Sequence, residues 1–209
     1  MIKSASLEDE LFIVFTLGGK VFRLAKRIQK MIAEHYDIYE DQEYPVLHLT
    51  IDRIKKNKFE KAVKVIDDII GDIEDINIYI EEIDCFKEEV DWFKVEKGNK
   101  LLLLDVKNTI SLQKAAKKIH QSLANKNIST IDNYEEWNFH ITLVNNNFTS
   151  NPISEKDFSE LCYLLEDLKV PFNSYAATLE IWQASLDPDK RILKKYNLKS
   201  REEDNEQQN

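Results

Sequence analysis

The pattern apolar-His-apolar-Thr-apolar occurs twice, in Leu47-His48-Leu49-Thr50-Ile51 and in Phe139-His140-Ile141-Thr142-Leu143. Successive side chains of a β-strand point to opposite faces, so a strand places the histidine and the threonine together on one face. The three apolar side chains of each stretch then point to the other face, toward a core. Each stretch is therefore predicted to be a strand that presents one imidazole and one hydroxyl away from its core.

Composition makes a chance origin of this repeat improbable. With four histidines and seven threonines in 209 residues, two such pairs are expected with a probability of roughly 0.7% on composition alone. A single His-x-Thr would be explained by the fit of both residues to a half-exposed sheet face. Two of them indicate a functional site. The remaining histidines, His35 and His120, are predicted to be surface residues.

The segments around the two motifs follow the same order in both halves of the chain. Apolar periodicity predicts strand, helix, strand, helix and strand over 11–17, 20–34, 46–51, 58–70 and 76–86. The same order is predicted over 101–106, 109–124, 139–144, 154–168 and 173–184, followed by a turn at 187–189 and a closing strand over 191–196. His48 and His140 come 37 and 39 residues after the start of the first strand of their halves.

This duplication predicts an α+β fold in which antiparallel sheets of two lobes face a central cleft and the helices lie outside. We expect one bilobal domain over 1–198, with pseudo-repeats at about 10–90 and 100–196 and a polar, disordered tail over 199–209. A hairpin is expected around 97–99. The alternative is an α+β domain whose halves share their element order by coincidence.

Charge and composition exclude several classes of function. The chain has 29 Lys and Arg against 38 Asp and Glu, a net charge of −9, whereas binding along an extended nucleic acid requires many cations. Four glycines leave no glycine-rich phosphate loop. No signal peptide and no apolar run of membrane-spanning length is recognised. Cys85 and Cys162 are predicted to be buried, reduced thiols, which favours a cytoplasmic location.

Two imidazoles and two hydroxyls suit a particular chemistry. Imidazole has an ordinary pKa near neutrality, so His48 can act as base while His140 acts as acid in the same turnover, or the reverse. The hydroxyls of Thr50 and Thr142 can donate hydrogen bonds to non-bridging phosphate oxygens. This combination is what the cleavage or transfer of a phosphodiester at a ribose requires.

The paired His-x-Thr motifs in duplicated strand–helix halves resemble the two-histidine (2H) phosphoesterase superfamily, which includes LigT-like RNA 2′,3′-cyclic phosphodiesterases and 2′-5′ RNA ligases. The resemblance covers about residues 10–196. It implies hydrolysis of a 2′,3′-cyclic phosphate, or of a related 2′-5′ or cyclic phosphodiester, without a metal or cofactor. It also implies that one histidine activates water and the other protonates the leaving ribose oxygen.

One position departs from the family pattern. LigT-like members often have Arg five residues after the second histidine, and this chain has Asn145 there. Arg53 stands five residues after the first histidine, where it is either a phosphate ligand by pseudo-symmetry or a solvated surface residue. The departure favours a nucleotide or short oligonucleotide over a large RNA, and the protein is expected to be a monomer.

Aromatic residues precede both motif strands, in the loops over 34–45 and 127–138. Tyr134 and Trp137, together with Phe15 on the first strand, are candidates for stacking on a base. Ordinary packing at the junction of helix and sheet is the alternative for the loop residues. Two other functions remain open: a non-catalytic nucleotide- or RNA-binding module with this fold, and a metal hydrolase, for which no third metal ligand is recognised.

Overall fold

The computed structural model describes residues 9–39, 44–86, 100–146, 149–166, 172–185 and 187–198. The first half forms β1 (Glu10–Gly18), α1 (Gly19–Tyr36), β2 (Leu49–Lys55), α2 (Phe59–Ile69) and β3 (Asn77–Phe86). The second half forms β4 (Leu101–Lys107), α3 (Ile110–Ala124), β5 (His140–Asn145), α4 (Glu155–Glu166) and β6 (Phe172–Gln183), followed by α5 (Pro188–Arg191) and β7 (Ile192–Asn197). Short 3₁₀ turns are η3 (Lys56–Lys58), η4 (Ile70–Asp72) and η5 (Tyr134–Glu136).

The predicted order of strands and helices is therefore found in the structure. The turn expected at 187–189 is the start of the single-turn helix α5, because the side chain of Asp187 caps it by accepting from the backbone N–H of Asp189. The hairpin expected around 97–99 and the tail over 199–209 lie outside the described residues.

The strands join in one antiparallel sheet of seven strands, which confirms the α+β class. Its order is β2-β1-β6-β3-β4-β5, and β7 pairs with the C-terminal half of β6. The first two strands of each half lie together, but the third strand is exchanged: β6 lies beside β1, and β3 beside β4. This arrangement puts the two motif strands, β2 and β5, at opposite ends of the order.

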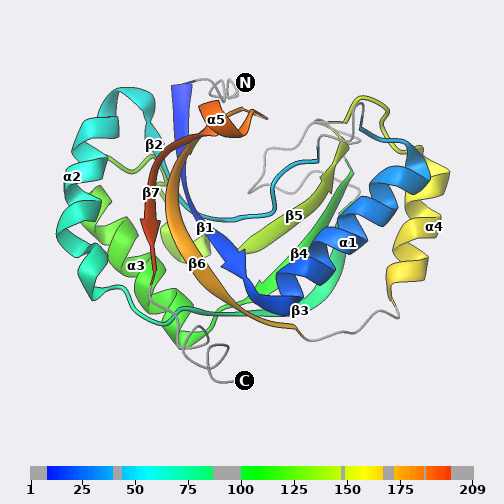
Figure 1. The fold of residues 1–209 in the computed structure, drawn as a ribbon, viewed down its shortest axis with the longest axis horizontal. Coiled ribbons are helices and arrows are strands. Elements are labelled where there is room, and N and C mark those ends of the chain that lie inside the picture. Colours follow the sequence, from blue (N-terminus) through cyan, green and yellow to red (C-terminus); the bar gives the residue numbers. More distant parts are fainter. Residues whose placement is uncertain are drawn as a thin grey trace.

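The helices lie in two pairs on the outer side of the curved sheet (Figure 1). The pair α2 and α3 packs against β2, and α1 and α4 lie on the other side, where α1 contacts β6, β1 and β5 and α4 contacts β3. Each side therefore combines elements from both halves of the sequence. The main hydrophobic core lies between sheet and helices, and β1 contributes alternating buried side chains to it: Leu11, Ile13, Phe15 and Leu17.

A disulfide joins Cys85 of β3 to Cys162 of α4, with the two Cα atoms 6.0 Å apart. The prediction of reduced thiols is therefore wrong, and the cysteines no longer support a cytoplasmic location. The two residues are 77 positions apart, and only the packing of α4 against β3 brings them together.

Among the described residues, no helix has both the length and the apolar character needed to cross a bilayer.

Candidate functional site

The two motif histidines are held in the same way. His48 directly precedes β2 and His140 begins β5. Nδ1 of each ring lies close to a carbonyl oxygen two residues earlier, at 2.7 Å from Val46 and 3.0 Å from Asn138. A carbonyl oxygen only accepts, so Nδ1 must donate and carry the proton. In the neutral ring the lone pair is then on Nε2, the nitrogen that can take up and release a proton in both residues.

Burial makes both imidazoles weaker bases than an ordinary histidine. Burial lowers the pKa of His140 to about 4; the hydrogen bond to Asn138 opposes this shift, and the charge of His48 adds to it. Burial also lowers the pKa of His48, against the effect of the Val46 hydrogen bond and with that of the positive charge of Arg191. The two rings thus interact electrostatically, and the neutral form of each is favoured.

The motif threonines share one face of the sheet, called here the motif face. Thr142 lies opposite Leu103, two residues from the pair Asp105–His140, so it shares a face with His140. Thr50 lies opposite Val14 of β1. The side chains of both threonines are partly exposed.

A β-bulge in β2 changes which side chains reach the motif face. The register shifts between Ile13 and Val14, so Asp52 pairs with Ile13 while Thr50 pairs with Val14. Strict alternation would put Thr50 and Asp52 on one face. The bulge instead turns Asp52 toward the helices and brings Arg53, opposite Phe12, onto the motif face.

Arg53 is already engaged on that face. Its Nη1 donates to Oε2 of Glu10 at 3.4 Å, and its guanidinium lies 5.5 Å from the centroid of the Trp137 ring. Trp137 in turn donates from Nε1 to the backbone oxygen of Thr50. Arg53 and Trp137 are thus near the first motif, and their proposed contacts with substrate stay predictions.

Two of the predicted base-stacking residues make other contacts in the structure. Phe15 is fully buried in the main core, opposite Leu49 and Leu179, because the alternation of β1 turns it to the helix side. Tyr134 stacks on His120 with ring centroids 3.8 Å apart, and its hydroxyl donates to the backbone oxygen of Ile51. The prediction for Phe15 is wrong, because Phe15 is a core residue. Tyr134 packs between α3 and the edge of β2, and its contact with a base stays a prediction.

A buried carboxylate holds β2 from the helix side. Asp52 is inaccessible to solvent and accepts from His120 Nδ1 at 3.0 Å, from Ser129 Oγ at 2.7 Å and from the backbone N–H of Arg53 at 2.6 Å. The prediction that His120 is a surface residue is wrong. Its side chain is only 13% exposed, because it turns toward the buried carboxylate of Asp52 and donates to it. His35 is exposed as predicted. The sequence signal that could have revealed the buried role of Asp52 is its position as a charged residue within an apolar strand.

Sequence reasoning also missed the contribution of β6 and α5 to the site. The Trp182 ring lies 4.7 Å from the His48 ring, centroid to centroid. Its Nε1 donates to Glu180 at 2.6 Å, and Glu180, only 2% exposed, also accepts from Thr178 and pairs with Lys195. Arg191 also belongs to this group, with its guanidinium 4.7 Å from the Trp182 ring centroid.

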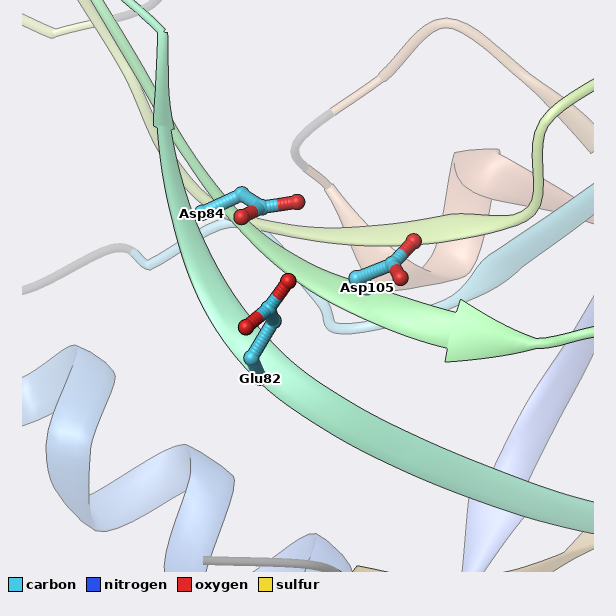
Figure 2. Close-up of side chains that lie close together, drawn as sticks. All are labelled: Glu82, Asp84 and Asp105. Atoms are coloured by element: carbon cyan, nitrogen blue, oxygen red, sulfur yellow. The ribbon is translucent and has the colours of Figure 1, made fainter. Parts of the chain in front are cut away.

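Three carboxylates gather between β3 and β4 (Figure 2). Glu82, Asp84 and Asp105 each place a carboxylate oxygen within 4.8 Å of the others, and this group is called here the acidic cluster. Asp105 lies opposite His140 in the sheet. Burial raises the pKa of Asp84 and of Asp105, and neighbouring carboxylates raise both further. Such oxygen ligands suit Mg²⁺ or Ca²⁺, although exposed acidic groups are also common without a metal. The cluster makes the His140 side of the face negative.

The comparisons with known proteins point to one family. The family model of the AKAP7 2′5′ RNA ligase-like domain matches residues 18–198. No curated protein matches the chain by sequence. Among solved structures, the protein TT0787 of Thermus thermophilus is similar with a TM-score of 0.57 and 12% identity, and a phosphoesterase with 0.50 and 14%. E. coli LigT complexed with 3′-AMP has a TM-score of 0.48 and 15% identity.

Each of these matches covers 92% of this chain and 99% of the other. At such low identity, the two with TM-scores of 0.50 and 0.57 show a shared fold over nearly the whole length. The family model matches most of the chain independently of them. The chain belongs to the AKAP7 2′5′ RNA ligase-like domain family.

Proposed function

We propose that this protein is a phosphoesterase that opens a 2′,3′-cyclic phosphate, or a related 2′-5′ or cyclic phosphodiester, of a nucleotide or short RNA end. The observation that carries the proposal is the matched setting of His48 and His140. Each donates from Nδ1 to a backbone carbonyl and so keeps Nε2 for proton transfer. Two imidazoles in the same tautomer on the two motif segments can serve as base and acid in one reaction.

In this mechanism, Nε2 of one histidine takes a proton from water while the water oxygen attacks phosphorus. The bond from phosphorus to one ribose oxygen breaks, and that oxygen receives a proton from the other histidine. The hydroxyls of Thr50 and Thr142 donate to the non-bridging oxygens, where negative charge increases. Water is consumed, a phosphomonoester and a ribose hydroxyl are formed, and the histidine pair ends with its protons exchanged.

The low pKa values fit a site that is completed by its substrate. A phosphodiester anion bound between the rings raises the pKa of whichever imidazole must act as acid. In a protein of net charge −9, this favours a small or end-bound partner over an extended nucleic acid or a membrane. We propose a monomeric enzyme that acts on a nucleotide or a short oligonucleotide, with no metal or cofactor in the reaction.

The test is an assay of the full chain in EDTA. The panel contains 2′,3′-cyclic nucleotides, 2′-5′ oligoadenylate and RNA with cyclic-phosphate ends, and the regiochemistry of each product is determined. We expect turnover of at least one member, with a loss of at least about 10²-fold in both His48→Ala and His140→Ala. Full activity in either variant, or activity that EDTA abolishes and zinc restores, would contradict the mechanism. Binding without turnover would indicate a nucleotide-binding module instead.

A further inference from the structure

The charges on the motif face are unevenly distributed. The acidic cluster lies on the His140 side, where Asp105 is the cross-strand neighbour of the histidine itself. A phosphodiester carries a negative charge and is repelled from this side. Its binding therefore needs a cation on the His48 side.

Of the two positions where the motifs would supply that cation, one has no charge and the other has an arginine that is already paired. Asn145 stands five residues after His140 and carries no charge. Arg53 reaches the motif face, but its Nη1 is paired with Glu10 at 3.4 Å and its guanidinium lies over Trp137. A substrate phosphate would have to compete with Glu10 for this arginine.

Arg191 is a better-placed cation and comes from outside both motifs, at the end of α5. Its guanidinium lies 4.7 Å from the Trp182 ring centroid, and the same ring lies 4.7 Å from that of His48. Trp182 is fixed by its hydrogen bond to Glu180. Trp182 thus contacts both residues, and the guanidinium lies close enough to the first motif histidine for its charge to lower the pKa of His48.

One hydrogen-bond donor of Arg191 is unused among the residues that the structure describes. Its Nε is buried and has no hydrogen-bond partner, as is also true of Arg53. Unlike Arg53, Arg191 is in no ion pair with a described residue, although the charges of Glu180 and Asp187 act on it. Leaving a buried N–H donor unpaired is unfavourable, and a planar guanidinium is well suited to the oxygens of a phosphate. A ligand oxygen beside His48 would satisfy it.

We propose that Arg191 binds the phosphate of the substrate on the His48 side of the histidine pair, with its guanidinium donating to a non-bridging oxygen. The role rests on the proposed function and deepens it, because it assigns the phosphate to a residue outside both motifs. Trp182 and Glu180 are then positioning residues for this cation.

The test measures binding of inorganic phosphate to the full chain by calorimetry, which does not require turnover. Arg191→Met is compared with Arg191→Lys and with Lys190→Met, a control that removes the adjacent exposed lysine and the same unit of charge. We expect phosphate affinity to fall at least about tenfold in Arg191→Met, to be partly restored in Arg191→Lys, and to change little in Lys190→Met. Titration of His48 by NMR should show a higher pKa in Arg191→Met alone.

The outcomes separate this proposal from the proposed function. Equal phosphate affinity in wild type and Arg191→Met, an unchanged pKa of His48, or no phosphate binding by the wild type would overturn the role of Arg191. If the wild type hydrolyses a cyclic phosphate with a KM that Arg191→Met does not raise, the enzymatic proposal stands and this one falls. If no substrate is turned over but phosphate binding depends on Arg191, the anion site stands without the reaction.

Discussion

The carbonyl oxygens of Pro45 and Leu143 share one donor, the side-chain amide of Gln29, whose Nε2 lies 3.1 Å from the first and 3.0 Å from the second. Pro45 lies three residues before His48, and Leu143 lies three residues after His140 in β5. Gln29 is buried within α1. One helix residue outside both motifs therefore connects the segments that carry the two histidines.

Replacing Gln29 with Leu should weaken both the fold and the reaction. Two carbonyl oxygens lose their donor, one of them in a buried hydrogen bond, and we expect the free energy of unfolding to fall by about 1–3 kcal/mol. Urea denaturation measures this change. The rate on a cyclic phosphate should fall as well, because the spacing of the histidines is less well fixed. Gln121→Leu, at an exposed position of α3, is the control, and equal stability of the two variants would refute the role of Gln29.

The low pKa of His140 predicts a dependence of stability on pH. The ordinary value is 6.5 and the folded value is about 4, so between these pH values the unfolded chain binds a proton that the folded protein does not. The free energy of unfolding should therefore decrease as the pH falls from about 6.5 to about 4. The difference between wild type and His140→Gln isolates this contribution, because Asp84 and Asp105 are present in both. NMR titration should place the midpoint of His140 near pH 4; a midpoint near 6.5 would refute the burial argument.

The disulfide predicts that protein purified without reductant has no reactive thiol. Cys85 and Cys162 close a loop over a separation of 77 residues, and such a link stabilises the folded state by about 4 kcal/mol in the chain-entropy model. Cys162→Ala and treatment of the wild type with reductant should lower the melting temperature to a similar extent. Alkylation of the unfolded, unreduced chain followed by mass spectrometry provides the check, and two alkylated cysteines would contradict the disulfide.

The sequence predicted the order of the elements because their apolar periodicity is a local property, and each strand or helix carries it within its own residues. The exchange of β3 and β6 between the two sides is non-local, and no pattern within one segment encodes it. The bulge in β2 is equally hidden, since it depends on the register with β1. Strict alternation would place Asp52 on the motif face and Arg53 on the helix side, and the bulge reverses both positions. For the same reason, Arg191 and Trp182 could not be associated with His48 before the strands were placed.

The network around Asp52 gives the final prediction. Asp52 adjoins the bulge that sets which residues of β2 reach the motif face, and three donors converge on its carboxylate from β2, α3 and the segment before η5. Asp52→Ala leaves these donors without their acceptor, and at about 1 kcal/mol each the free energy of unfolding should fall by about 3 kcal/mol. Asp132→Ala, at an exposed position, should leave stability unchanged. The bulge also places Thr50 and Arg53, so Asp52→Ala should have a lower kcat than the wild type. The kcat is measured under conditions in which denaturation curves show that the variant is fully folded. Wild-type kcat in that protein would show that the network stabilises the fold without positioning the first motif.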